Sequence, residues 1–194
     1  MDDRSNYGAV VIGTSAGGLN ALTQLLTALP YDFPLPVMIV QHRSKDERGL
    51  LEEVLQEKCK IEVRQANEKE PISGETVYIA PPDYHLLVER DRTFSLTTDA
   101  KVNFSRPSID VLFETAAEVY RSKLVGIILT GANDDGSNGI KMIRNFNGFT
   151  IAQDPKEAEF PAMPLAAIKT GSIQSILNLT NITNFLLSQV TARP

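Results

Sequence analysis

Three kinds of side chain suited to acyl transfer each follow a different apolar run of the sequence. Ser15 follows the first run, His42 ends the second, and the adjacent pair Asp134 and Asp135 follows a later one. A serine hydroxyl becomes an effective nucleophile when a neighbouring imidazole takes its proton, and a carboxylate can orient that imidazole. The spacing does not choose between Asp134 and Asp135, because either one can instead cap the next helix. Together these residues predict nucleophilic catalysis by a serine.

A glycine-rich loop surrounds Ser15. Residues 13–18 read Gly-Thr-Ser-Ala-Gly-Gly between an expected strand and an expected helix, where a dinucleotide-binding protein carries G-x-G-x-x-G. Ser15 replaces the middle glycine, which would let a pyrophosphate approach the backbone, so a nucleotide site is disfavoured. The loop also fits G-x-S-x-G, an elbow that exposes a nucleophilic serine, and the N–H groups of Ala16 and Gly17 would stabilise an anion there. The alternative is an ordinary turn in which Ser15 caps the helix.

The chain has two histidines, and the sequence places them differently. His42 ends the stretch Val37 to His42, at the position where a dinucleotide binder would carry an acid. The carboxyl ends of neighbouring parallel strands face one crevice, so His42 is expected to face Ser15 and to act as its base. His85 lies at a loop or strand start and is the second candidate for that role. The alternative for either residue is a packing or surface histidine.

Alternating strand and helix patterns predict the architecture. Five short apolar runs are expected as strands, at residues 7–12, 36–40, 76–80, 124–130 and 149–153, and four of them have the composition of parallel strands buried on both faces. Leucines spaced three and four apart over residues 19–29 predict a helix, as do the apolar positions of 109–120. We expect a doubly wound three-layer α/β/α fold with a mostly parallel sheet. Residues 71–96 are expected as an antiparallel hairpin or edge extension of the same sheet, within one domain covering 1–194.

Composition excludes several classes of protein. The 194 residues carry 19 basic and 24 acidic side chains, a net charge of −5, which disfavours a nucleic-acid binder. The single Cys59 cannot form an internal disulfide, which fits a reducing compartment. The first residues do not resemble a secretion signal, and no apolar run approaches the ~20 residues that a membrane span needs. We expect a cytoplasmic protein without membrane insertion.

The sequence resembles the catalytic domain of the chemotaxis protein-glutamate methylesterases of the CheB type. The similar segments occur in order over nearly the whole chain: Gly13 to Gly18, Gln41-His42, Ile79 to His85, Phe104 to Phe113, Leu129 to Gly136, and Gln153-Asp154-Pro155 on to Met163-Pro164. The resemblance implies the fold described above. It also implies hydrolysis of glutamate γ-methyl esters on methyl-accepting chemoreceptors, and deamidation of receptor glutamines, without a metal or an organic cofactor.

The resemblance also assigns roles to residues. It places the nucleophile on Ser15, the base on His42 and the acid on Asp135, which leaves Asp134 as the secondary candidate. It implies that the backbone N–H of Ala132 is an oxyanion donor. Two positions depart from the family pattern: Ala16 where members with a regulatory domain often carry threonine, and Leu165 where the usual residue is arginine. Both departures concern the handling of substrate.

Two further expectations concern the whole chain. The first expected strand starts by residue 7, which leaves no room ahead of it for a receiver domain. Control is therefore expected from a separate partner or from abundance. The alternative function is a non-catalytic module of a signalling pathway that binds a phosphate or a protein through the glycine-rich loop.

Overall fold

A parallel sheet of seven strands forms the centre of the computed structural model, which describes residues 7–43 and 50–189. Its order is β3-β4-β2-β1-β7-β8-β9, and every neighbouring pair is parallel. The strands are β1 (Ala9–Thr14), β2 (Val37–Gln41), β3 (Glu62–Gln65), β4 (Thr76–Ile79), β7 (Leu124–Ile128), β8 (Phe149–Gln153) and β9 (Ser175–Leu177). The expected single domain also includes residues 1–6, 44–49 and 190–194, which lie outside the described part of the chain.

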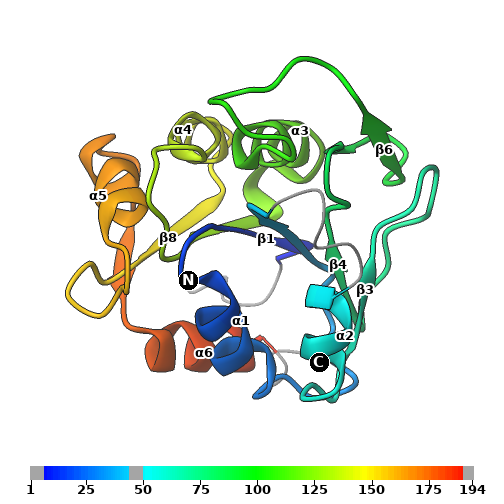
Figure 1. Cartoon of the computed structure of the whole chain (residues 1–194), viewed down its shortest axis with the longest axis horizontal. Helices are drawn as coiled ribbons and strands as arrows, with labels where there is room; N and C mark the ends of the chain where they lie inside the picture. Colours follow the sequence, from blue (N-terminus) through cyan, green and yellow to red (C-terminus); the bar gives the residue numbers. More distant parts are fainter. Residues whose placement is uncertain (1–6, 44–49, 190–194) are drawn as a thin grey trace.

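Helices cover both faces of this sheet (Figure 1). One face carries α1 (Gly18–Leu26), α2 (Leu50–Gln56) and α6 (Leu179–Ser188). The other carries α3 (Ile109–Tyr120), the 3₁₀ turn η1 (Arg121–Lys123), α4 (Ser137–Asn145) and α5 (Ala162–Lys169). The longest described helix, α3, has 12 residues, and within residues 7–43 and 50–189 no helix is long and apolar enough to cross a bilayer.

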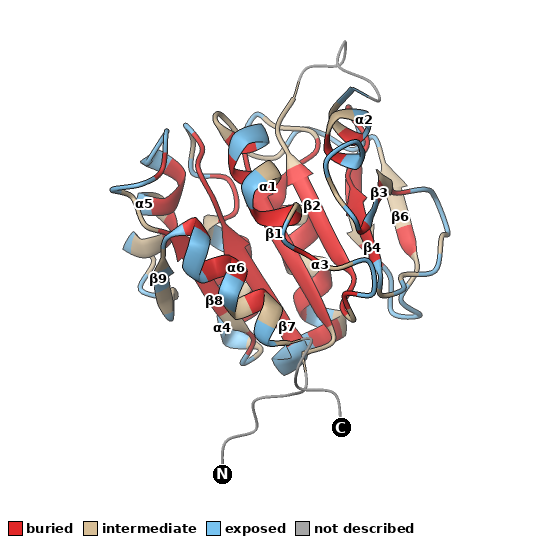
Figure 2. Cartoon of the chain, turned by 90° about the horizontal axis from the view of Figure 1, so that it is seen from below, coloured by how far each residue is buried: buried red, intermediate tan, exposed pale blue. Residues whose placement is uncertain are grey.

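The alternation of side chains along the central strand explains these three layers. In β1, Val10 and Ile12 pack into the cluster beneath α1 and α6, whereas Ala9 and Val11 pack into the cluster beneath α3 and α4. Both sets are fully buried, as the colouring of the inner strands in Figure 2 shows. The architecture confirms the predicted doubly wound three-layer α/β/α fold.

The strand order reverses at β1. The chain passes from β1 to β2 on one side, and β7 pairs with β1 on the other. In open α/β sheets, ligand sites form outside the carboxyl ends of the strands at such a reversal. The loops after β1, β2 and β7 therefore meet in the place where a site is expected.

The antiparallel hairpin differs from its expected position. Strands β5 (His85–Val88) and β6 (Phe94–Thr97) form a separate two-stranded sheet, while Thr76–Ile79 is an inner strand of the parallel sheet. Two consecutive prolines, Pro81 and Pro82, follow β4 and lack the N–H groups that a continuing strand would use. The hairpin instead packs on α3, where the N–H of Val88 donates to Thr115 Oγ1 at 3.1 Å.

Candidate active site

The backbone of Ser15 is held firmly between β1 and α1. Its N–H donates to the carbonyl of Thr130 at 3.0 Å, and its carbonyl accepts from Gly18 N–H at 2.9 Å and from Gln41 Nε2 at 2.8 Å. Gly17, the N-cap of α1, has φ 77°, in the left-handed region that favours glycine. The loop thus presents the half-buried Ser15 to an open crevice that it shares with His42.

His42 lies at the carboxyl end of β2, beside the end of β1. Its N–H donates to the carbonyl of Thr14 at 3.1 Å, which ties it to the residue before Ser15. Its Nε2 lies 2.8 Å from Asp135 Oδ2, and 12% of its side chain is exposed. The imidazole is therefore oriented by a carboxylate and still accessible from the crevice.

Asp135 is fully buried in the loop between β7 and α4. Both oxygens are heavily hydrogen-bonded, and several donors belong to the start of α3. Besides His42, the donors are Ile109 N–H (2.7 Å), Ser108 Oγ (2.9 Å), Asn103 Nδ2 (3.1 Å), Gly136 N–H (3.1 Å) and Asp110 N–H (3.2 Å). Asp135 therefore satisfies N–H groups in the first turn of a helix distant in sequence while it holds His42.

These donors decide the ionisation of Asp135. Burial alone raises its pKa, but hydrogen bonds from His42 and the Ile109 N–H, attraction to His42 and the hydrogen bond from Asn103 hold the pKa below the ordinary value of 3.8. The neighbouring Asp110 shifts the other way. Burial is the largest cause of its raised pKa, and the charge of Asp135 adds to it, although the N–H of Gly139 opposes the shift. Asp135 is thus the carboxylate held ionised beside the imidazole.

The other candidate acid and base lie in different surroundings. Asp134 is exposed, and no side-chain contact joins it to His42 within the described residues. His85 is buried, its Nδ1 accepting from Ser108 N–H at 3.2 Å and its Nε2 donating to the Ala100 carbonyl at 3.1 Å. Both ring nitrogens of His85 are thus occupied by backbone groups, those of Ser108 and Ala100. The structure therefore brings Asp135, and neither Asp134 nor His85, to His42.

The candidate oxyanion donors lie on two tethered segments. Over the described residues, the backbone N–H groups of Ala16, Gly17 and Ala132 have no protein acceptor. Thr130 Oγ1 donates to the Ala16 carbonyl at 3.0 Å and so joins the loop after β1 to the loop after β7. Gly131 is fixed in turn by Phe160, whose carbonyl accepts its N–H at 2.9 Å. The loops after β1 and β7 therefore carry N–H groups without a protein acceptor, on backbone that neighbouring hydrogen bonds hold in place.

The sequence reasoning missed three residues around the site, and only one of them carried a local signal. Asn103 and Ser108 contact Asp135 across 32 and 27 positions of the chain, and no local pattern reports such pairs. Ser108 could have been noticed as a capping residue type directly before a helical run. Asn133 was also missed: its Nδ2 lies 3.2 Å from His42 Nδ1, and its Oδ1 accepts the Asp135 N–H at 3.2 Å.

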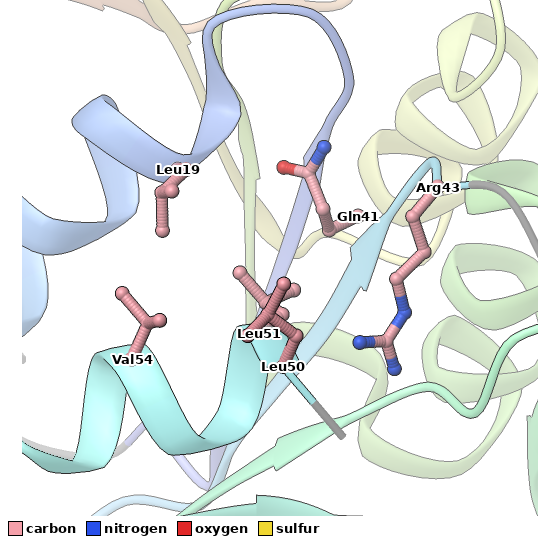
Figure 3. A pocket seen from close by; sticks show the side chains of 6 residues that line it. All are labelled: Leu19, Gln41, Arg43, Leu50, Leu51 and Val54. Atoms are coloured by element: carbon pink, nitrogen blue, oxygen red, sulfur yellow. The ribbon is translucent and has the colours of Figure 1, made fainter. Parts of the chain in front are cut away.

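An apolar cavity of about 340 Å³ adjoins the crevice (Figure 3). Its lining comes from the start of α1, the end of β2 and helix α2: Leu19, Gln41, Arg43, Leu50, Leu51 and Val54. Leu19, Gln41 and Arg43 also line the crevice of Ser15 and His42, so the two spaces are neighbours that share these walls. The guanidinium of Arg43 is paired with Glu52, which leaves the cavity walls largely aliphatic.

Comparisons with known proteins place the chain in a family. Residues 10–186 match the family model described as CheB methylesterase. A relative from Leptospira interrogans is 50% identical over 182 residues, which are 94% of each chain. The protein-glutamate methylesterase/protein-glutamine glutaminase of Symbiobacterium thermophilum is 35% identical over 97% of this chain, which spans 52% of that relative.

A solved structure agrees with the sequence comparisons. The Thermotoga maritima CheB methylesterase catalytic domain superposes with a TM-score of 0.90 at 32% identity, over 94% of this chain and 98% of that domain. Both the order of the elements and the sequence therefore match the same group of proteins. The chain belongs to the CheB methylesterase family of carboxylic-ester hydrolases.

Proposed function

We propose that this chain hydrolyses glutamate γ-methyl esters in proteins, with Ser15 as nucleophile, His42 as base and Asp135 as the acid that orients His42. The observation that carries the proposal is the 2.8 Å contact between His42 Nε2 and the ionised Asp135, at the strand end next to Ser15. Because Nε2 faces Asp135, the Ser15 proton must pass to Nδ1, which in this structure also lies 3.2 Å from Asn133 Nδ2. The substrate class comes from the Symbiobacterium relative, a protein-glutamate methylesterase/protein-glutamine glutaminase.

The reaction proceeds through an acyl-enzyme. Ser15 Oγ attacks the ester carbonyl as its proton passes to His42 Nδ1, and the oxyanion is stabilised by the N–H groups of Ala16 and Ala132, each contributing roughly 3–4 kcal/mol. The ester C–O bond breaks, and methanol leaves with the proton from His42. A water molecule then attacks the acyl carbonyl as its proton passes to His42 Nδ1, the bond to Ser15 Oγ breaks, Oγ recovers the proton from His42, and a glutamate carboxylate is released. A glutamine substrate would follow the same course with ammonia as the leaving group.

The partners follow from the substrate. We infer that the esters lie on methyl-accepting chemoreceptors or similar signalling proteins. The open crevice supports this, since its exposed mouth can receive a side chain that projects from a protein surface. The demethylated glutamate gains a negative charge, and we infer that repulsion by a protein with a net charge of −5 favours departure of that product.

Removal of the nucleophile tests the proposal. Ser15→Ala should abolish methanol release from membranes that carry methylated receptor, while Ser122→Ala, a change at an exposed serine before β7, should leave it unchanged. Methanol release that survives in Ser15→Ala would refute the assignment. Receptor binding without turnover by the unaltered chain would instead support the alternative of a non-catalytic binding module.

A further inference from the structure

Asn133 closes a ring of three hydrogen bonds with the candidate base and acid. The Asp135 N–H donates to Asn133 Oδ1 at 3.2 Å, Asn133 Nδ2 lies 3.2 Å from His42 Nδ1, and His42 Nε2 lies 2.8 Å from Asp135 Oδ2. The first of these bonds joins residues two apart, as in an Asx turn. Asn133 therefore occupies the nitrogen of His42 that points away from the acid.

The ring fixes the direction of each hydrogen bond. A backbone N–H can only donate, so the atom of Asn133 that faces Asp135 N–H must be the oxygen. The Asn133 NH₂ group then faces His42, and because it can only donate, His42 Nδ1 must be its acceptor. The imidazole proton consequently lies on Nε2, where it donates to the ionised Asp135.

This arrangement places two donors in competition for one lone pair. A neutral imidazole has a single acceptor nitrogen, and the Ser15 hydroxyl needs it in order to transfer its proton. Within the described residues, Ser15 Oγ makes no hydrogen bond to His42. We propose that Asn133 is a positioning residue that blocks His42 Nδ1 in the resting protein and must release it before Ser15 can react. This inference rests on the proposed function.

Ala132, the residue before Asn133, suggests how substrate binding frees His42 Nδ1 from Asn133. Asn133 directly follows the exposed residue Ala132, whose N–H has no acceptor in the described part of the chain and is a candidate oxyanion donor. A substrate carbonyl bound at Ala132 would contact the same short segment that carries the Asn133 side chain. Asn133 is half-buried, and at 3.2 Å its hydrogen bond to His42 is at the upper end of the usual range. Binding of the substrate can therefore displace this side chain at low cost.

Two substitutions with opposite expected effects test the role. Asn133→Ala removes the competing donor and should speed labelling of Ser15 by a fluorophosphonate probe, and raise kcat for methanol release, by about two- to tenfold. Asn133→Asp keeps an oxygen for the Asp135 N–H but places a carboxylate at Nδ1, which favours a proton on that nitrogen. Its labelling at neutral pH should be roughly tenfold slower or more, and should recover as the pH rises. Asp134→Ala, an exposed change in the same loop, should match the unaltered protein.

The outcomes separate this inference from the function beneath it. Labelling of a folded Asn133→Ala variant at or below the original rate would overturn the role of Asn133, as would normal labelling of Asn133→Asp. An equal acceleration in Asp134→Ala would also overturn it, because the effect would then belong to the loop. If Ser15→Ala still releases methanol, the proposed function fails and the role of Asn133 fails with it.

Discussion

Asp135 connects the candidate active site to the stability of the fold. Its carboxylate holds His42 and also accepts the N–H groups of Ile109 and Asp110 at the start of α3. A side chain that accepts so many hydrogen bonds while fully buried leaves several unpaired donors when it is changed. Substitutions here are therefore expected to affect activity and folding together, unlike substitutions of Ser15.

The two adjacent aspartates should respond very differently to the loss of charge. Asp135→Asn should reduce methanol release by about 10³–10⁴-fold, because an amide at this position does not hold the imidazole in the required tautomer. It should also lower the free energy of unfolding by about 1–3 kcal/mol, since its NH₂ group would face other donors. Asp134→Asn should change neither quantity, because Asp134 is exposed. Equal losses of activity in the two variants, measured beside urea unfolding, would refute this assignment of the acid.

The lowered pKa of Asp135 predicts how stability depends on pH. In the unfolded chain this carboxyl titrates near its ordinary value of 3.8, and in the folded protein its pKa is lower. The contribution of Asp135 to stability is thus complete well above the unfolded pKa of 3.8 and is lost as the pH falls through the folded pKa. The free energy of unfolding should fall more steeply below about pH 4 in the unaltered protein than in Asp135→Asn. Asp110 is present in both proteins, and its raised pKa changes stability in the opposite direction. Parallel curves of unfolding free energy against pH for the two proteins would contradict the prediction.

At the scale of single residues, the sequence identifies the candidate catalytic residues but not the contacts between them. Ser15, His42 and the aspartate pair follow from residue type and from their places after apolar runs. The choice of Asp135 over Asp134 depends on which carboxylate turns inward, and adjacent residues in a loop give no such information. The roles of Asn103 and Asn133 depend on contacts between separate loops, which no spacing rule reports.

At the scale of the elements, the approach of β1 to α3 positions Asp135, the candidate acid. A Cβ added to Gly13 would lie 2.4 Å from Ile109 Cγ2, so the strand and the first turn of α3 come close only because this residue is glycine. The Ile109 N–H is also the donor at 2.7 Å from Asp135 Oδ2. A substitution at Gly13 in β1 should therefore shift Asp135 by displacing Ile109 at the start of α3.

Gly13→Ala tests this coupling. The added methyl group should displace Ile109, destabilise the fold by about 1–3 kcal/mol and lower kcat, because the Ile109 N–H would move away from Asp135. Gly8→Ala is the matched control, since a Cβ there would lie 3.3 Å from the nearest atom, Tyr120 Cδ1. Thermal unfolding and methanol release measure the two effects. A destabilised variant with unchanged kcat would show that this contact does not position the acid.

The elements were predictable to the extent that they bury apolar side chains in a regular pattern. The leucine spacing of residues 19–29 predicts α1, which ends earlier than the pattern, at Leu26. Leu19 fits the pattern but is 42% exposed, because it borders the cavity rather than the core. The separation of β5 and β6 from the main sheet was not predictable, because it depends on packing against α3, and a strand pattern does not specify its partner.

At the scale of the whole molecule, the two hydrophobic clusters share one sheet. The cluster under α1 and α6 and the cluster under α3 and α4 lie on opposite faces of the same strands, so neither can lose its packing without exposing the other. The protein contains five tyrosines and no tryptophan, and tyrosine fluorescence can therefore report tertiary structure. We infer a single cooperative domain from this arrangement.

Equilibrium unfolding tests that inference. Far-ultraviolet circular dichroism and tyrosine fluorescence should give coincident urea transitions with one midpoint, as two-state domains do. The Ser15→Ala variant should unfold at nearly the same urea concentration, because the Ser15 side chain makes no hydrogen bond within the described residues. Two separated transitions would show that the faces of the sheet unfold independently.

The position of Asp135 at the start of α3 has a consequence for the history of such folds. A related protein that has lost catalysis but keeps this fold is expected to retain Asp135, because replacing Asp135 would destabilise the start of α3. The Ser15 side chain, by contrast, makes no hydrogen bond within the described residues, so its replacement should cost the fold little. An inactive descendant should therefore retain an aspartate that no longer serves a reaction. The presence of that aspartate in a distant sequence would be a poor sign of activity, and the serine would be the informative residue.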